Sequence, residues 1–315
     1  MSAEANNLNA FDLDLWMRER LDRVERALDT WITAEVPQGE DHGAPAALVD
    51  AMRYAVLDGG KRLRPLLVLA AHEAVASLGH QCDAGALRAA CAVELIHAYS
   101  LVHDDMPCMD NDVLRRGKPT VHVQFGQASA LLAGDALQAQ AFEVLLPEDA
   151  NVPLALSARW CRLLAVASGA QGMAGGQAID LASVGVALDQ AALTHMHRLK
   201  TGALLQASVM MGAACAEIGS VQTQALSRYG AALGLAFQVV DDILDVTADA
   251  STLGKTAGKD AANDKPTFVS LMGLTQAQAH ADALLDEAHQ ALAQTGLPAV
   301  ERLHQLADWV ARRSH

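Results

Sequence analysis

The chain has 315 residues, a formal net charge of −14, 51% hydrophobic residues and only 4% aromatic residues. This surplus of Ala, Leu and Val favours close-packed helices over a β-sandwich. The acidic charge argues against nucleic acid or an anionic membrane surface as the main partner, because a polyanion approaches against the protein's own field. We therefore predict an all-α protein, most simply one domain spanning residues 1–315 with a flexible N-terminus at residues 1–10.

The sequence shows no sign of a targeting or membrane-spanning segment. No N-terminal stretch combines basic residues with an apolar run, and the longest charge-free apolar segment, near residues 202–216, is shorter than a bilayer span. The five cysteines are odd in number, widely spaced and without a Cys-x-x-Cys pair, which disfavours both a disulfide framework and a zinc site. We expect a cytoplasmic protein.

The predicted elements, in chain order, are helices bounded by glycine and proline. An amphipathic helix is expected over residues 11–35 and a loop over 37–45, after which Pro65 is expected to be the first residue of a helix. Apolar, Ala-rich runs predict buried helices at 85–106 and 127–145. Further helices are expected at 153–172, 189–217, 220–247, 267–272 and 276–313.

Two aspartate clusters end helices that are otherwise apolar. The first contains Asp104, Asp105 and Asp110, and the second places Asp241 and Asp245 on one helical face. Carboxylates at a helix C-terminus meet the negative end of the helix dipole and repel one another, so a cation has to offset them. One such cluster is equally well explained as a solvated helix end, but two copies favour Mg²⁺, which binds few carboxylates and completes its shell with water and phosphate.

Basic residues lie near both aspartate clusters. Lys61, Arg62 and Arg64 stand beside a helix N-terminus, where free backbone N–H groups favour a phosphate. Arg115 and Arg116 are adjacent and therefore point in different directions, so the pair serves two anions, or one anion and a structural carboxylate. The simplest interpretation is that the protein binds two diphosphates.

One histidine shares a helical stripe with the first cluster. His97, Leu101 and Asp104 are spaced at i, i+4 and i+7, which directs the imidazole along the same wall as the aspartates. His97 is then a donor to a phosphate oxygen. The alternative is a buried histidine that is satisfied by the backbone or by Glu94.

These motifs resemble the trans-prenyl diphosphate synthase family, and within it the bacterial-type farnesyl diphosphate synthases. The matching segments follow the family's order along most of the chain: residues 59–65, 94–105, 115–120, 133–137, 176–177, 200–202, 237–245 and 253–255. The resemblance implies the isoprenoid synthase fold, a single helical bundle around a central cavity, in a homodimer. It also implies that the two aspartate motifs face each other across the mouth of that cavity.

The resemblance implies a role for each candidate site residue. Asp104 and Asp110, with Asp105 in support, would hold Mg²⁺ on one wall, and Asp241, with Asp245 nearby, would hold it on the other. The allylic diphosphate is expected to contact Arg115, Lys200, Thr201, Gln238 and Lys255. Isopentenyl diphosphate is expected to contact Lys61, Arg64, His97 and Arg116. The residues expected to be catalytic are Asp104, Asp105, Asp110, Lys200 and Asp241.

The implied reaction condenses isopentenyl diphosphate with dimethylallyl or geranyl diphosphate to give (2E,6E)-farnesyl diphosphate, by ionisation, condensation and elimination. Tyr99 precedes Asp104 by five residues and so lies about 7.5 Å deeper along the helix. The resemblance implies that Tyr99, with Ser100 beside it, limits the product length. An ordinary core tyrosine is the alternative.

Three other functions share part of this pattern. A geranyl or geranylgeranyl diphosphate synthase would carry the same motifs and differ in pocket depth. A class I terpene cyclase also pairs Mg²⁺ with aspartates, but it has no use for a second diphosphate site. A non-catalytic regulatory subunit of the same fold would be expected to lose one aspartate cluster, and both are intact here.

Overall fold

The computed structural model describes residues 2–35, 43–57, 59–78, 82–147, 151–247 and 266–312, and for residues 2–12 and Ser77 the backbone alone. Its regular structure is helical, apart from one antiparallel hairpin within the described residues, β1 (Leu114–Arg115) with β2 (Lys118–Pro119). The predicted all-α fold class is therefore confirmed.

Helix packing divides the chain into two compact units. The first consists of Met1–Leu69 with Cys82–Ser157, and the second of Ala70–Gln81 with Ala158–His315. Helix α3 (Leu63–Val75) and the short turn η1 (Ala76–Leu78) carry the chain across the first boundary between them. The prediction of a single domain stays a prediction.

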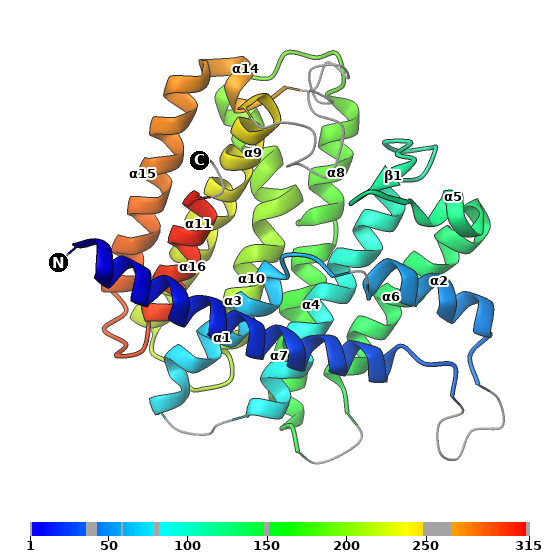
Figure 1. Ribbon diagram of the computed structural model, residues 1–315, viewed down its shortest axis with the longest axis horizontal. Helices are drawn as coiled ribbons and strands as arrows, with labels where there is room; N and C mark the ends of the chain where they lie inside the picture. The colour runs from blue at the N-terminus through cyan, green and yellow to red at the C-terminus, as the bar shows by residue number, and fades with distance from the viewer. Residues whose placement is uncertain are drawn as a thin grey trace. The chain divides into compact units, whose positions relative to one another are not determined.

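Helix α4 (Asp83–Asp104) is the core of the first unit. It packs mainly against α6 (Gln127–Leu145), and α1 (Ser2–Trp31), α2 (Ala46–Val56) and α5 (Val121–Phe125) complete the unit (Figure 1). Within the described chain, α4 alone is long and apolar enough to cross a membrane, but 72% of that stretch is buried inside the protein. Such burial on all sides is expected of a helix at the centre of a packed unit.

Helix α11 (Ser220–Thr247) has the corresponding place in the second unit. It packs against α15 (Leu274–Ala293), α10 (Ala203–Ala213), α16 (Glu301–Arg312) and α14 (Phe268–Met272) (Figure 1). The remaining helices among the described residues are α7 (Leu154–Ser168), α8 (Met173–Ala182), α9 (Gln190–His197) and the π-helical turn η2 (Arg198–Gly202).

The N-terminal helix is longer than its periodicity predicts. It begins at Ser2 instead of residue 11 and ends at Trp31, so residues 2–10 are helical. The flexibility of residues 1–10 stays a prediction. No glycine or proline precedes Pro37, and Ala and Glu at the start favour a helix, so nothing in the sequence interrupts it.

Three further helix boundaries differ from prediction. Pro65 is the third residue of α3, whose first hydrogen bond runs from the Leu66 N–H to the Arg62 carbonyl (3.1 Å); its missing N–H still falls among the unpaired donors of the first turn. The helix predicted over 276–313 is two helices, α15 and α16, separated at Gly296, whose φ is +63°. The helix predicted over 153–172 ends at Ser168.

Candidate active site

The first aspartate cluster lies where α4 ends and the chain turns back. The Asp110 N–H donates to the Asp104 carbonyl (2.8 Å), and the Asp112 N–H donates to the Asp105 carbonyl (3.1 Å). Asn111 makes the turn with a φ of +51°, a left-handed conformation that asparagine tolerates well. The loop therefore brings Asp110 beside Asp104, which are the two residues predicted to hold Mg²⁺ in this unit.

Asp105 is paired with an arginine. Both of its carboxylate oxygens accept hydrogen bonds from Arg115, at 2.6–3.0 Å, and its side chain is only 4% exposed. Burial alone would lower the Arg115 pKa, but the hydrogen bonds and negative charge of Asp105 raise it overall. This bidentate pair holds the hairpin on the end of α4 and gives Asp105 a supporting place in the cluster.

The hairpin turn separates the two adjacent arginines. Arg116 and Gly117 both have positive φ, +53° and +78°, as a two-residue turn matched to the strand twist requires. Arg115 thus stays on strand β1 with Asp105, whereas Arg116 reaches the loop before α3 and donates to the Gly59 carbonyl. The sequence left open whether the two arginines bind two anions, or one anion and a structural carboxylate. In the structure Arg115 pairs with a structural carboxylate, that of Asp105.

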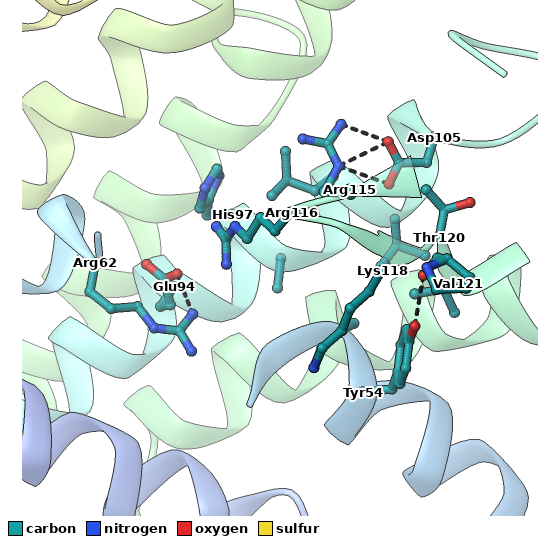
Figure 2. Close-up of a pocket in the computed structure, with 15 residues that line it drawn as sticks. Tyr54, Arg62, Glu94, His97, Asp105, Arg115, Arg116, Lys118, Thr120 and Val121 are labelled. Carbon is teal, nitrogen blue, oxygen red and sulfur yellow. Dashed lines mark hydrogen bonds and ion pairs between the residues drawn. The ribbon is translucent and has the colours of Figure 1, made fainter. Parts of the chain in front are cut away.

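A pocket in the first unit is lined by α4, the hairpin and α2 (Figure 2). His97, Glu94, Leu101 and Asp105 line it from α4. The sequence predicted that His97 and Asp104 lie on the same wall. The pocket is instead lined by His97 and by Asp105, and Asp104 is not among its lining residues. The remaining lining residues are Tyr54, Ala55, Arg62, Ala98, Val102, Arg115, Arg116, Lys118, Pro119, Thr120 and Val121.

His97 lies in a strongly positive environment. Burial lowers its pKa well below the usual value, and the charges of Arg64, Arg116, Arg115 and Arg62 lower it further. The imidazole is therefore neutral at physiological pH and keeps one N–H donor. A site with this excess of positive charge favours an anionic ligand. Of the other predicted isopentenyl diphosphate ligands, Arg64 acts on His97 through its charge, and Lys61 is exposed on the preceding loop.

The residues predicted to set product length lie on α4. Tyr99 is 8% exposed and its ring meets the His103 ring edge-on, with centroids 5.7 Å apart. Burial and the nearby charge of Asp104 raise the Tyr99 pKa. Ser100 is partly buried and donates its hydroxyl to the His97 carbonyl (2.7 Å).

The second cluster lies near the end of α11, and its three aspartates have different environments. Asp242 is 2% exposed and accepts hydrogen bonds from Gln238 (2.9 Å) and from the Phe268 backbone N–H (2.8 Å), so it joins α14 to α11. Asp245 is buried and Asp241 is half-buried. Asp242 therefore has a structural role, and Asp241 and Asp245 remain the candidate metal ligands.

Lys200 and Thr201 lie in η2, a π-helical turn of the kind that often occurs at functional sites. The Lys200 ammonium pairs with Asp180 at 2.6 Å, and the Thr201 hydroxyl donates to Gln238 (3.1 Å). Thr201 and Gln238 are thus brought together as predicted ligands of one substrate. Lys255, the remaining member of that set, lies outside the described residues.

The acidic residues fit a hard divalent cation, although they do not enclose one. Within the described ranges, no group of three or more His, Cys, Asp or Glu side chains is arranged to hold a metal ion. Mg²⁺ needs few protein ligands, since water and substrate phosphates fill the rest of its shell. Asp104 and Asp110, set side by side by their loop, are oxygen donors of the kind that Mg²⁺ prefers.

Comparison with known proteins agrees with this geometry. The family model for polyprenyl synthetase matches residues 45–303. The chain belongs to the polyprenyl synthetase family. It is 50% identical to a probable farnesyl diphosphate synthase of Bradyrhizobium diazoefficiens, over 93% of this chain and 86% of that protein. It is 46% identical to the farnesyl diphosphate synthase of Escherichia coli, over 85% and 89%.

Solved structures agree with the fold of this polyprenyl synthetase. An FPP/GFPP synthase from Zymomonas mobilis has a TM-score of 0.82 at 40% identity, covering 96% of this chain and 99% of that one. A geranyltransferase from Helicobacter pylori, solved with magnesium and isoprenyl diphosphate, has a TM-score of 0.79 at 33% identity, covering 94% and 97%. The polyprenyl synthetase is therefore a prenyltransferase with the all-α fold of the isoprenyl diphosphate synthases.

Several residues around the site of this synthetase were not found from the sequence. Asp180 is the partner of Lys200, Gly176 packs against the Lys200 backbone, and Arg62 turns inward to Glu94. The matching segment at 176–177 contains Gly176 but not Asp180, and α8 lies between the helices predicted at 153–172 and 189–217.

His197 is a buried histidine that the prenyl synthetase keeps neutral. It is 6% exposed, its ring lies on Phe268 with centroids 5.5 Å apart, and neither ring nitrogen has a hydrogen-bond partner among the described residues. Burial lowers its pKa to about 4, although the charge of Asp180 acts in the opposite direction.

This pKa predicts a pH dependence of stability. Below pH 6.5 His197 is protonated in the unfolded chain, whereas in the folded chain it stays neutral down to about pH 4. The free energy of unfolding should therefore decrease as the pH is lowered from 6.5 to 4. The His197 contribution to it should be about 2 kcal/mol smaller at pH 5 than at pH 8.

The measurement is urea unfolding of the wild type and of His197→Asn at both pH values. The substitution should reduce the loss of stability between pH 8 and pH 5 by that amount. His195→Asn, at an exposed histidine of the same helix, is the control and should retain the wild-type dependence. An equal pH dependence in wild type and His197→Asn would contradict the prediction.

Proposed function

We propose that this prenyltransferase is Mg²⁺-dependent and condenses isopentenyl diphosphate with dimethylallyl or geranyl diphosphate to give (2E,6E)-farnesyl diphosphate. The main support is the environment of His97, a neutral donor on which the charges of four arginines act. Such a site suits a diphosphate, and it lies in the same unit as Asp104 and Asp110. The names of the relatives at 46–50% identity support the farnesyl product.

The two substrates are assigned to two sets of residues. Isopentenyl diphosphate is assigned to the positive pocket, against His97 and Arg116, with Lys61 from the loop before α3 and Arg64 from its first turn. The allylic diphosphate is assigned to Arg115 together with Lys200, Thr201, Gln238 and Lys255, the set that the family resemblance implies.

Asp104 and Asp110 would hold Mg²⁺ on one side, with Asp105 in support, and Asp241 would hold it on the other, with Asp245 nearby. The magnesium named with the Helicobacter pylori geranyltransferase supports this choice of metal. When bound, Mg²⁺ neutralises charge on the departing diphosphate. Lys200 adds positive charge at the same leaving group, and Asp180 fixes the position of its ammonium.

The reaction then proceeds without a nucleophile from the protein. The allylic C–O bond breaks to give a carbocation and pyrophosphate, the double bond of isopentenyl diphosphate forms the new C–C bond, and the released pyrophosphate takes the proton. His97 and the arginines hold isopentenyl diphosphate in line for the attack. The apolar side chains beside them, such as Leu101 and Val102, exclude water that would quench the cation.

We further propose that the chain acts as a single domain in a cytoplasmic homodimer. Adjacent leucines of α6, Leu131 and Leu132, are 47% and 56% exposed, and Val123 of α5 is 49% exposed. An apolar surface of this kind is best covered by a second subunit, and symmetric pairs are the commonest soluble oligomers.

The test is product analysis with purified protein, Mg²⁺, labelled isopentenyl diphosphate and either dimethylallyl or geranyl diphosphate. Chromatography after dephosphorylation should give farnesol from both starters. Geraniol or geranylgeraniol as the end product would reassign the enzyme to a different chain length. No product from any starter, together with binding to a homologous synthase, would indicate a non-catalytic regulatory subunit.

The position of Tyr99 predicts the determinant of chain length. Tyr99→Ala should shift the product from farnesyl toward geranylgeranyl length, because the growing chain is proposed to extend along α4 from Asp104 toward Tyr99 and the smaller side chain would let it extend further. Tyr99→Phe keeps the ring and should keep the farnesyl product. The same chromatographic assay checks both variants, and an unchanged product from Tyr99→Ala would show that another residue forms the floor.

A further inference from the structure

The three cations at the start of α3 have different environments. Lys61 is exposed and Arg64 is half-buried, whereas Arg62 is only 5% exposed. The Arg62 Nε donates to Glu25 of α1 (2.7 Å), its Nη1 donates to Glu94 of α4 (2.6 Å), and its Nη2 donates to the carbonyl of Val56 at the end of α2. Each nitrogen of the guanidinium is therefore occupied by a protein acceptor.

These contacts make Arg62 unsuitable as a direct ligand of a diphosphate. Two carboxylates surround its single positive charge, and the Glu94 side chain is as deeply buried as Arg62, each being 3% exposed. Figure 2 shows Arg62 joined to Glu94 at one end of the pocket, with His97 and Arg116 nearer to its centre. Breaking a buried pair of this kind leaves an uncompensated charge, so the arrangement is strongly held.

Arg62 also has an unusual backbone. Its φ of +46° is left-handed, which is uncommon for a residue other than glycine, and Gly59 and Gly60 before it have φ values of +73° and +134°. The Arg62 carbonyl accepts the first hydrogen bond of α3. The buried side chain therefore stabilises a backbone path that the chain would otherwise disfavour, and that path sets where α3 begins.

The same loop positions Arg116. A Cβ atom at Gly60 would lie 2.6 Å from an Arg116 nitrogen, so the guanidinium packs directly against the Gly60 backbone, and Arg116 donates to the Gly59 carbonyl. Lys61 directly precedes Arg62 and Arg64 follows two residues later, so both lie on the stretch of backbone that the Arg62 side chain holds. Three of the four residues assigned to isopentenyl diphosphate thus depend on the path of this loop.

We propose that Arg62, locked by Glu25 and Glu94, is a positioning residue that sets the affinity for isopentenyl diphosphate without touching it. The inference rests on the proposed function, since it takes Lys61, Arg64 and Arg116 as ligands of that diphosphate. The three neighbouring cations then have two different roles. Lys61 and Arg64 bind the substrate, and Arg62 holds the start of α3 against α1 and α4.

The experiment compares steady-state kinetics of the full-length wild type, Arg62→Met and Arg62→Lys, well below their melting temperatures. Arg62→Met should raise the KM for isopentenyl diphosphate roughly tenfold to a hundredfold, the effect expected when ligands shift by about 1 Å. The KM for geranyl diphosphate should change much less. Arg62→Lys keeps one cation between the glutamates and should restore part of the affinity.

Arg53→Met is the matched control. Arg53 also donates to backbone carbonyls, those of Asp29 and Ile32, and pairs with the Asp29 carboxylate, but it does not line the pocket. Its loss should lower stability while leaving the KM for isopentenyl diphosphate at the wild-type value. If Arg62→Met does not fold, the KM for isopentenyl diphosphate is measured on Glu25→Gln instead and should also rise. This substitution keeps the side-chain shape and removes one charged partner of Arg62.

A folded Arg62→Met with an unchanged KM for isopentenyl diphosphate would overturn the proposal, as would equal changes in the KM of both substrates. If Glu25→Gln has to decide, an unchanged KM in that variant has the same consequence. Calorimetric titration with isopentenyl diphosphate keeps this test separate from the proposed function. If the wild type binds isopentenyl diphosphate but forms no product, the proposed condensation reaction is refuted. The affinity of the Arg62 variants for isopentenyl diphosphate still tests the positioning role in that case.

Discussion

Replacing Asp104 or Asp241 by alanine is expected to lower turnover by on the order of a thousandfold, the effect of losing several kcal/mol of transition-state stabilisation. Each substitution removes a carboxylate assigned to Mg²⁺, one from the end of α4 and one from the end of α11. The assay is product formation at saturating concentrations of both substrates. EDTA should abolish activity in the wild type, and added Mg²⁺ should restore it.

The control for this prediction is Asp83→Asn. Asp83 is an exposed aspartate at the opposite end of α4, so the substitution changes the charge of the same helix far from the site. It should leave turnover close to that of the wild type. Full activity in Asp104→Ala or Asp241→Ala, or activity that survives EDTA, would refute the assignment of the two aspartate clusters to a metal-bound leaving group.

Gly176→Ala is the second substitution with a large expected effect. A Cβ atom at Gly176 would lie 2.1 Å from the Lys200 backbone nitrogen and 2.5 Å from its Cα, so backbone and not a flexible side chain would have to move. We expect a loss of about 1–3 kcal/mol in unfolding free energy, as for other overpacked sites. Turnover should fall roughly a hundredfold if η2 moves Lys200 by about 1 Å.

Unfolding by urea and product formation measure the two effects of Gly176→Ala separately. Ala178→Ser, at an exposed position of the same helix, is the control and should change neither. Wild-type stability and turnover in Gly176→Ala would show that η2 has more room beside α8 than the packing indicates.

The fold class and the two aspartate clusters could be predicted because they depend on local sequence. Apolar periodicity defines α6 and α11 to the residue, and a largely apolar helix that ends in aspartates is unusual wherever it packs. The predicted neighbours Thr201 and Gln238 also meet, since their motifs come from a family pattern that reflects one site.

The partners of the charged residues could not be predicted, because they are distant in sequence. Glu25 lies 37 residues before Arg62, and Asp180 lies 20 residues before Lys200. Nothing local distinguishes the inward Arg62 from the neighbouring Lys61 and Arg64. Helix α8 was missed for a related reason: its glycines suggest a loop, whereas Gly176 is there because another backbone approaches closely.

The double hydrogen bond of Asp242 has a consequence for how this enzyme tolerates change. Asp242 accepts from Gln238 of α11 and from the first N–H of α14, so the chain leaves α11 and returns beside it. Neutralising Asp242 would therefore release α14 from α11 and disturb the same helical turn that sets the register of Asp241 and Asp245.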